Sequence, residues 1–502
     1  MTALRSSTVA DVLRRSAARV PHRIALRFAD RRWTYAELDA AVTRAAAHLL
    51  GLGLAKGDRV AAYGKNSDAY LIGFLACARA GLIHVPINYN LTGEELAYLL
   101  DQSGSTVALT DPALRPALDA VAGGLTHLLP LRDTGDSLLA AATEGETPEL
   151  DVEVADTDLA QLLYTSGTTS RPKGAMMTHR ALVHEYVSCI VGLDLTEDDD
   201  PLHVMPLYHS AQMHVFLLPW LAVGATNQLL EVPDPGEILR RIEDGHRAFF
   251  AAPTLWVALT NHPDFGARDL SALRKAYYGA SIMPGPILER LREAMPELGF
   301  YNCFGQSEIA PLATILGPAE HADRPESAGR PALFVELRVV DENGDDVPPG
   351  EPGEVVYRSP QLCEGYWNKP EETAAAFRGG WFHSGDLVRA DEAGYLYVVD
   401  RIKDVINTGG VLVASREVED ALYTHPAVAE VAVIGLPDEK WIEAITAVVV
   451  SKEDVDADAL IAHARAKLSA FKVPKAVHFV GELPRNASGK ILKRELRDQL
   501  GA

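Results

Sequence analysis

The chain has 502 residues, more than one ordinary hydrophobic core accommodates, so we expect at least two domains. Hydrophobic residues make up 47% and charged residues 23%, as in globular enzymes, and the net charge of −22 argues against a nucleic-acid-binding protein, whose surface would be basic. No apolar run approaches the ~18 residues of a membrane-spanning helix. The four cysteines lie far apart, which argues against a disulfide framework and a zinc site. Together these features predict a cytoplasmic enzyme from a reducing compartment, without a transmembrane segment.

The first part of the chain alternates helix-like and strand-like segments. Apolar residues at helical spacing predict an amphipathic helix within residues 9–17. Helical patterns follow at residues 35–51 and 69–80, and strand patterns at residues 59–63 and 107–110. This alternation predicts an α/β fold in which mainly parallel sheets are flanked by helices.

The pattern changes near residue 335. Strand-like stretches at residues 335–340 and 354–358 flank an Asn343-Gly344 pair, which is typical of a tight hairpin turn, so a small antiparallel β-section is expected. Farther on, strands are predicted at residues 395–399, 431–435 and 444–450, and helices at residues 417–423 and 457–468. We therefore predict a large N-terminal domain of residues 1–400 and a small α+β domain of residues 401–502.

Residues 164–174, which read Tyr-Thr-Ser-Gly-Thr-Thr-Ser-Arg-Pro-Lys-Gly, are the most informative stretch. They follow an apolar strand-like approach and precede a helix-like segment that begins at Thr178. Backbone N–H groups, several hydroxyls and the Lys173 ammonium could together surround a polyphosphate. The stretch differs from the G-x-x-x-x-G-K-[ST] loop because no Ser or Thr follows the Lys173-Gly174 pair. Polar surface turns have a similar composition, so both interpretations stay open on this stretch alone.

The stretch closely resembles the signature of the adenylate-forming superfamily, which includes acyl-CoA synthetases, peptide-synthetase adenylation domains and firefly luciferase. Ser170 stands where the family usually has glycine, which predicts a slightly stiffer loop that is still active. The resemblance implies that the loop binds the phosphates of ATP, and that Thr165 is also a ligand of Mg²⁺. The implied residues are Thr165, Ser166, Gly167, Thr168, Thr169 and Lys173.

Two segments that resemble the family's adenine-binding motifs follow in the expected order. Residues 302–308 resemble an aromatic-Gly-x-Thr-Glu motif, with serine in place of the threonine. Phe304 would offer a flat face to adenine, Asn302 a hydrogen bond to its amino group, and Glu308 a hard oxygen ligand for Mg²⁺. Glu308 is also a catalytic candidate. The implied nucleotide-binding set is Gly279, Ala280 and Ser281 from a strand-end turn, together with Asn302, Phe304, Gly305 and Ser307.

The remaining nucleotide motifs lie toward the C-terminus. Asp386 matches the acid of the family's T-G-D motif, which binds the ribose hydroxyls, and Arg401 matches the ribose-contacting arginine. Lys403 matches the hinge of the mobile C-terminal domain, which places the hinge near residues 400–403. Lys490 matches the lysine that lies between the attacking carboxylate and the α-phosphate, where a cation offsets the repulsion of two anions. We predict that Lys490 is the adenylation catalyst.

The predicted acyl acceptor is coenzyme A. Gly409 and Gly410 match the segment that helps to form the pantetheine tunnel in CoA ligases, where glycines permit close backbone approach. The following Val411-Leu412 pair replaces a commoner polar pair, which leaves the details of that surface open. Two alternatives also stay open, namely transfer of the acyl group to a carrier protein and a catalytically silent adenylate-binding protein.

The acid is predicted from residues 206–219, which match the P-x-x-H segment beside the family's acyl pocket and include the catalytic candidate His209. The segment lacks the aspartate of amino-acid-activating relatives and the arginine that a dicarboxylate would need. Apolar side chains, including Met213, Phe216 and Leu217, favour a medium- to long-chain fatty acid. An aryl, short or dicarboxylic acid is the alternative. The predicted enzyme is therefore a fatty-acyl-CoA ligase that releases AMP and pyrophosphate, as a monomer or a homodimer.

The assignment of Lys490 predicts a separation of the two half-reactions. Lys490→Ala should lower acyl-adenylate formation by roughly 10²–10³, the scale of losing one preorganised charge stabiliser. The same variant, given synthetic acyl-adenylate and coenzyme A, should form thioester at a near-normal rate, because the lysine has no role in that step. Pyrophosphate release and thioester formation would be measured separately. An equal loss in both reactions, at unchanged stability, would show that Lys490 is not specific to adenylation.

Overall fold

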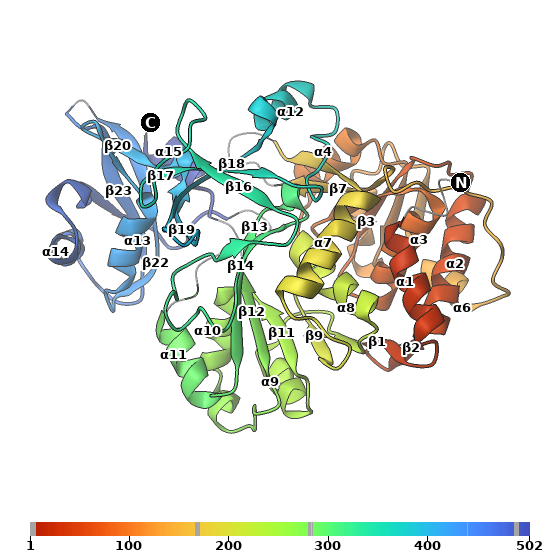
Figure 1. The fold of residues 1–502 in the computed structure, drawn as a ribbon. Coiled ribbons are helices and arrows are strands. Elements are labelled where there is room, and N and C mark those ends of the chain that lie inside the picture. Colours follow the sequence, from red (N-terminus) through yellow and green to blue (C-terminus); the bar gives the residue numbers. More distant parts are fainter. Residues whose placement is uncertain are drawn as a thin grey trace. The chain divides into compact units, whose positions relative to one another are not determined.

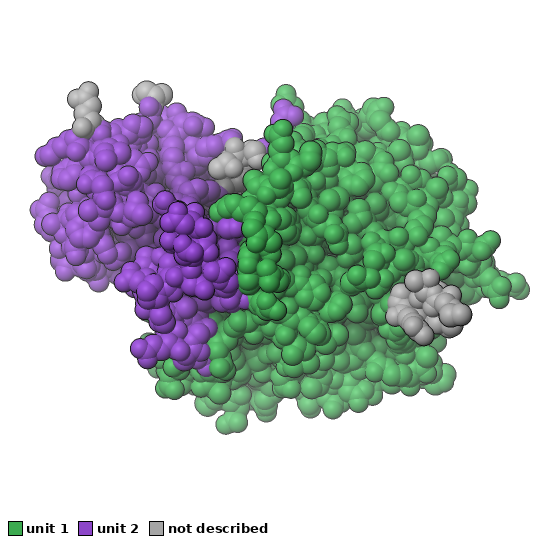
Figure 2. Space-filling model, turned by 45° about the horizontal axis from the view of Figure 1, so that its top comes forward, with its two compact units in different colours: residues 1–165, 172–336, 358–382 green, residues 166–171, 337–357, 383–502 purple. Residues whose placement is uncertain are grey.

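The computed structural model describes residues 7–165, 171–279, 283, 285–438, 440–485 and 491–501. The chain divides into two compact units, which Figure 2 shows in different colours. Unit 1 comprises residues 1–165, 172–336 and 358–382, and unit 2 comprises residues 166–171, 337–357 and 383–502. The domain boundary predicted near residue 400 falls inside unit 2 and stays a prediction about which part of the chain moves.

One sheet of unit 1 has six strands in the order β6-β5-β3-β4-β7-β8, of which Figure 1 labels β3 and β7. Its strands pair in parallel, except that β7 and β8 form an antiparallel pair. The strands predicted at residues 59–63 and 107–110 are confirmed as β3 and β5. The bounds are β3 (Arg59–Tyr63), β4 (Ile83–Ile87), β5 (Val107–Thr110), β6 (His127–Pro130), β7 (Leu159–Thr165) and β8 (Lys173–Thr178).

A second sheet has nine strands in the order β15-β14-β13-β12-β11-β9-β10-β1-β2. The central strands from β13 to β1 pair in parallel, and the outer strands β2, β14 and β15 pair antiparallel. These two sheets confirm the predicted mainly parallel α/β class. The bounds are β1 (Ile24–Phe28), β2 (Arg31–Thr34), β9 (Pro201–His203), β10 (Asn227–Leu229), β11 (Ala248–Ala251), β12 (Lys275–Gly279), β13 (Gly299–Gly305), β14 (Leu312–Leu316) and β15 (Arg330–Pro331).

Side-chain caps set the starts of several helices in unit 1. Thr34 and Glu37 form a capping box, and the helix predicted at residues 35–51 is confirmed as α2 with the same bounds. The helix predicted at residues 69–80 begins one residue earlier because Ser67 caps it. The helices are α1 (Val9–Arg19), α2 (Tyr35–Gly51), α3 (Asp68–Ala80), α4 (Gly93–Ser103), α5 (Arg115–Asp119), α6 (Leu138–Thr143), α7 (His179–Gly192), α8 (Leu218–Val223), α9 (Pro235–Glu243), α10 (Pro253–Asn261), α11 (Gly285–Ala294) and α12 (Pro370–Ala376).

Unit 2 contains two smaller sheets, β16-β17-β18-β19 and β21-β20-β23-β22, with β24 added beside β23. The predicted C-terminal helices and strands are confirmed as parts of α13, α14, β22 and β23. The bounds are β16 (Glu336–Val340), β17 (Pro352–Arg358), β18 (Phe382–Ala390), β19 (Leu396–Arg401), β20 (Ile406–Thr408), β21 (Val411–Val413), β22 (Val428–Asp438), β23 (Ile442–Ser451), β24 (Ala476–Phe479), α13 (Ser415–Tyr423), α14 (Ala457–Lys467) and α15 (Lys493–Leu500). In the part of the chain that the structure describes, no helix is long and apolar enough to cross a bilayer.

The turn after β16 is wider than the predicted two-residue Asn343-Gly344 turn. The Asp341 N–H donates to the Asp345 carbonyl at 2.9 Å, and the Asp341 carboxylate accepts from the backbone N–H groups of Asn343 and Asp345. The Asp341 side chain thus stabilises a turn over residues 341–345. This side-chain-to-backbone bonding competes with the tight turn that the Asn-Gly pair alone predicts.

A chain of four buried polar side chains crosses the core of unit 1. Burial lowers the pKa of His84 and His214 to about 3, so both rings are neutral. The Tyr186 hydroxyl lies 2.9 Å from His214 Nδ1, His214 Nε2 lies 2.7 Å from Gln161 Oε1, and Gln161 Nε2 lies 3.0 Å from His84 Nδ1. His214 belongs to the π-helical segment η2 (Ala211–Leu217). The polar chain therefore ties η2 to α7, β7 and β4.

We expect His214→Phe to lower the free energy of unfolding by about 1–3 kcal/mol, because Gln161 and Tyr186 each lose a buried hydrogen-bond partner. The phenyl ring would keep the edge contact with Phe74, whose ring centroid lies 5.5 Å away. Urea denaturation would measure the change. Adding Tyr186→Phe removes one orphaned hydroxyl and should recover part of the loss; a further loss of similar size would contradict the assigned bond.

Candidate functional site

The antiparallel pair of β7 and β8 fixes both ends of the phosphate-loop candidate. Thr165 ends β7 and lies opposite Lys173, the first residue of β8. The Thr165 hydroxyl lies 3.5 Å from the Lys173 carbonyl oxygen. The predicted loop residues Ser166, Gly167, Thr168 and Thr169 lie outside the described residues. The hairpin thus presents one hydroxyl and one ammonium at the two points where the loop leaves and re-enters the sheet.

The other edge of β8 is occupied by residues 364–367. The Met176 N–H donates to the Gly365 carbonyl at 2.9 Å, and the Trp367 N–H donates to the Gly174 carbonyl at 2.8 Å. Tyr366 consequently lies opposite Ala175 in an antiparallel bridge. Backbone hydrogen bonds therefore place a segment nearly two hundred residues farther along the chain directly beside the end of the phosphate-loop candidate.

Tyr366 contacts two of the predicted site residues. The Lys173 ammonium lies over its ring, 4.3 Å from the centroid. Its hydroxyl donates to Glu308 Oε1 at 3.0 Å. Burial and the nearby Glu308 carboxylate raise the pKa of Tyr366, so the phenol stays protonated and acts as the donor. Motif resemblance does not identify Tyr366; its local signal in the sequence is the aromatic pair Tyr366-Trp367, which core packing would equally explain.

Glu308 lies in a 3₁₀ turn, η4 (Ser307–Ile309), that follows β13. It is only 7% exposed, and the Cys363 N–H donates to its carbonyl at 2.8 Å. The Ser307 hydroxyl lies 3.1 Å from the Ser210 hydroxyl, next to the candidate His209. Gly305 ends β13, where an added Cβ would lie 1.9 Å from the Pro311 carbonyl oxygen, so no larger residue fits. The structure thus brings the predicted Glu308 and Ser307 to the start of the predicted acyl segment.

A buried carboxyl supports the backbone that follows Glu308. Glu185 has no exposed surface; it accepts the Leu312 N–H at 2.9 Å and the Gln361 side-chain amide at 2.5 Å. Gln361 also donates to the Leu312 carbonyl at 3.1 Å. Burial raises the pKa of Glu185 well above its usual value. This network fixes the backbone between η4 and β14.

The described adenine-binding candidates lie on two adjacent parallel strands, β12 and β13. Gly279 ends β12 opposite Cys303 of β13, and an added Cβ would lie 2.3 Å from the Cys303 carbonyl oxygen. The Asn302 amide nitrogen donates to the Ser327 carbonyl at 2.9 Å, which orients Oδ1 as the acceptor. Phe304 is half-buried on the same strand. Ala280 and Ser281 lie outside the described residues.

Unit 2 holds the predicted ribose-binding pair. Asp386 on β18 lies opposite Arg401 on β19, and Arg401 Nε lies 2.7 Å from Asp386 Oδ1. Arg401 also donates to the Ser384 carbonyl at 3.3 Å. Asp386 is buried and Arg401 is half-buried. The structure therefore brings these two residues together within one hairpin.

The hinge candidate Lys403 lies in the short turn η6 (Ile402–Asp404), directly after this hairpin. Gly409 and Gly410 connect β20 to β21 and have φ angles of 65° and 85°. Two consecutive positive φ angles define a tight hairpin turn, which explains the glycines without any approaching ligand. Val411 and Leu412 are 45% and 67% exposed. Lys490 lies outside the described residues.

The acyl segment differs from the expected open pocket wall. Met213, Phe216 and Leu217 have no exposed surface, and the Phe216 ring stacks on Phe250 with centroids 4.3 Å apart. These side chains belong to filled cores, so they do not line an open pocket. His209 is exposed at the start of the segment.

The predicted Mg²⁺ ligands are one carboxylate, Glu308, and one hydroxyl, Thr165. Among the described residues, no cluster of three or more His, Cys, Asp and Glu side chains could hold a metal ion. Mg²⁺ commonly binds through one or two carboxylates together with substrate phosphates. The donor set therefore fits Mg²⁺ held jointly with a nucleotide.

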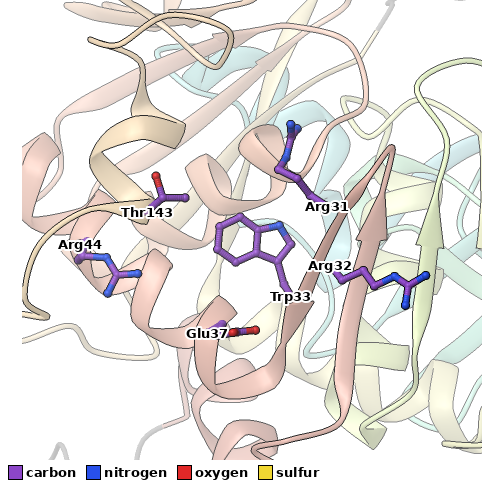
Figure 3. Close-up of a pocket in the computed structure, with 6 residues that line it drawn as sticks. All are labelled: Arg31, Arg32, Trp33, Glu37, Arg44 and Thr143. Atoms are coloured by element: carbon purple, nitrogen blue, oxygen red, sulfur yellow. The ribbon is translucent and has the colours of Figure 1, made fainter.

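A separate pocket of about 400 Å³ on unit 1 contains three arginines but none of the predicted site residues (Figure 3). Arg31 donates to the buried Asp68 carboxylate at 2.6 and 2.8 Å. Arg44 donates to the Ala142 carbonyl and the Thr147 hydroxyl. Both cations thus have structural partners, and we assign the pocket no function. Its lining residues are Arg31, Arg32, Trp33, Glu37, Arg44 and Thr143.

Known protein families and relatives match nearly the whole chain. Residues 13–367 match the AMP-binding enzyme family, and residues 417–490 match the AMP-binding enzyme C-terminal domain. Feruloyl-CoA synthase of an Amycolatopsis species is 40% identical over 97% of this chain and 98% of its own. Long-chain-fatty-acid–CoA ligase FadD13 of Mycobacterium tuberculosis is 34% identical over 94% of both chains. The solved anthranilate CoA ligase AuaEII, in complex with anthranoyl-AMP, has a TM-score of 0.90 at 28% identity and covers 99% of both chains.

Proposed function

We propose a substrate class for this chain, which belongs to the AMP-binding enzyme family and is an ATP-dependent acyl-CoA ligase. The proposed acid is aromatic, of the arylpropenoic type represented by ferulate. The observation that carries this proposal is the filled core formed by the residues that follow His209, where Phe216 stacks on Phe250. A planar acid that stops at the His209 turn requires less space within this core than a long alkyl chain does. The relative with 40% identity, named for feruloyl-CoA, supports the same class.

A medium- to long-chain fatty acid is the second candidate. Residues 206–219 contain no Asp, Glu, Lys or Arg, which suits any acid without a second charge, and the relative with 34% identity is named for long-chain fatty acids. Transfer to a carrier protein instead of coenzyme A is the alternative for the acceptor. The two acceptors are distinguished by measuring whether the thiol of coenzyme A or that of a carrier protein receives the acyl group.

In the proposed site, Lys173 and Thr165 bind the ATP phosphates together with the loop between them. Asn302 Oδ1 accepts from the adenine amino group, and the Phe304 ring lies against the base. Asp386 accepts from the ribose hydroxyls, and Arg401 holds its carboxylate in place. Glu308 and Thr165 would hold Mg²⁺, which when bound neutralises charge on the phosphates.

The acid's carboxylate then attacks the α-phosphate, a P–O bond forms, and pyrophosphate leaves. Lys490 is proposed to offset the repulsion between these anions. In the second step the coenzyme A thiolate attacks the acyl carbonyl, and AMP departs with the bonding electrons of the C–O bond. We propose that the residues 401–502 move between the two steps about a hinge near residues 400–403.

A panel of acids tests the substrate class. For ferulate we expect a kcat/KM at least about tenfold above that for octanoate, a difference of ~1.4 kcal/mol. CoA-dependent AMP formation would be measured with ferulate, benzoate, octanoate, palmitate and malonate. A value that rises from octanoate to palmitate and exceeds that of ferulate would favour the fatty acid. A preference for malonate would exclude both candidates.

The role of Asp386 predicts a specific defect in ATP use. Asp386→Asn should raise KM for ATP roughly 10- to 100-fold, because the ribose hydroxyls lose a charged acceptor worth about 1.5–3 kcal/mol. The control is Asp346→Asn, which removes an exposed carboxylate beside the same sheet, paired with Arg338 at 2.6 Å. Initial rates at varied ATP would be compared. Equal KM values in the two variants would remove Asp386 from the nucleotide site.

A further inference from the structure

We infer that Tyr366 is a positioning residue that holds the Glu308 carboxylate and the Lys173 ammonium in one fixed arrangement for adenylation. This inference rests on the roles proposed above for Glu308 and Lys173. Tyr366 contacts both groups, with its hydroxyl 3.0 Å from Glu308 Oε1 and its ring centroid 4.3 Å from Lys173 Nζ.

The hydroxyl contact fixes the orientation of the carboxylate. Tyr366 is 6% and Glu308 7% exposed, so water competes little for the hydrogen bond. A protonated phenol that donates to a buried carboxylate forms a charge-assisted bond, which is stronger and more directional than a neutral one. With Oε1 engaged in this way, the rotation of the carboxylate is restricted and Oε2 has a defined direction.

The ring contact acts on the phosphate-loop lysine. A flexible ammonium side chain loses conformational freedom when it is held in place, and an aromatic face attracts it without neutralising its charge. Lys173 therefore keeps its full positive charge for an anionic ligand. A carboxylate partner at the same place would compete with that ligand, whereas the ring does not.

The backbone of Tyr366 is itself rigidly placed. Its N–H donates to the Thr373 hydroxyl at 2.9 Å, and the neighbouring residues are hydrogen-bonded to β8. Tyr366 and Met176 also border a pocket of about 420 Å³ that extends to the start of α12. The ring consequently has a position that is set relative to the strand on which Lys173 lies.

Two substitutions separate the two contacts. Tyr366→Phe keeps the ring face for Lys173 and deletes the donor to Glu308, whereas Tyr366→Leu deletes both. For Tyr366→Phe we expect kcat/KM for ATP in acid-dependent pyrophosphate exchange to fall about 10- to 100-fold, with little change in metal-free ATP affinity measured by calorimetry. Tyr366→Leu should also weaken that metal-free affinity, because Lys173 loses its ring contact.

Tyr35→Phe is the matched control. The Tyr35 hydroxyl donates to the Ala225 carbonyl at 2.7 Å, and among the described residues no hydrogen bond or ring contact joins this fully buried residue to the site residues named above. Both Phe variants should lower the melting temperature by similar amounts, but only Tyr366→Phe should lower kcat/KM. If Tyr366→Phe lowers stability and leaves exchange as active as in Tyr35→Phe, Tyr366 is only a packing residue and the inference is overturned.

A double-mutant cycle with Glu308→Gln distinguishes this inference from the site assignment. If the hydroxyl acts through Glu308, adding Tyr366→Phe to Glu308→Gln should cause little further loss of exchange activity. Fully additive losses would overturn the inference while leaving the site assignment intact. If Glu308→Gln alone leaves exchange unchanged, the assignment of Glu308 fails, and the role inferred for Tyr366 fails with it.

Discussion

Strand β8 is hydrogen-bonded along both edges, and the arrangement of the unit 1 site depends on that constraint. β7 occupies one edge and brings Thr165 opposite Lys173, while residues 364–367 occupy the other and bring Tyr366 beside the same lysine. Because side chains alternate along a strand, a one-residue shift in either pairing would turn a contact residue to the opposite face. The register of β7, β8 and the distant residues 364–367 therefore determines which side chains meet at the loop.

The charged side chains of the described site follow a common rule, in which each has a partner that leaves it able to bind something else. Glu308 accepts from a neutral phenol, and Asp386 is paired with a half-buried arginine. Lys173 is held by a ring and keeps its charge. In a chain with a net charge of −22, a polyanionic ligand needs such local cations, because the overall field repels it. The site can therefore be cationic locally although the protein is acidic.

Much of the fold could be predicted because its signals are local. Helix α2 has an apolar periodicity and a capping box within a few residues, and its predicted bounds are the observed ones. The predicted bounds of the short buried strands β3 and β5 are also the observed ones. Motif resemblance identified Glu308 and Asp386 as candidates. The structure shows a partner for each carboxylate, Tyr366 for Glu308 and Arg401 for Asp386. Tyr366 could not be found in this way, because its role depends on pairing with a strand nearly two hundred residues earlier. The filled core around Phe216 was missed for a related reason: an apolar side chain looks the same in sequence whether it lines a pocket or packs against Phe250.

That filled core bears directly on which acids the enzyme can accept. In the proposed site, an alkyl chain that entered the core formed by the residues after His209 would displace Phe216 from its stack on Phe250, and removing a large aromatic side chain from a core costs about 3–5 kcal/mol. Each methylene newly buried returns about 0.8 kcal/mol, so an alkyl chain shorter than roughly four to six methylenes cannot offset this cost, whereas a longer chain can. The polar chain through His214 opposes the accompanying movement of η2, since any shift would break buried hydrogen bonds. A planar aromatic acid that stops at the turn would avoid both costs, and this difference is the physical basis on which we propose an aromatic substrate.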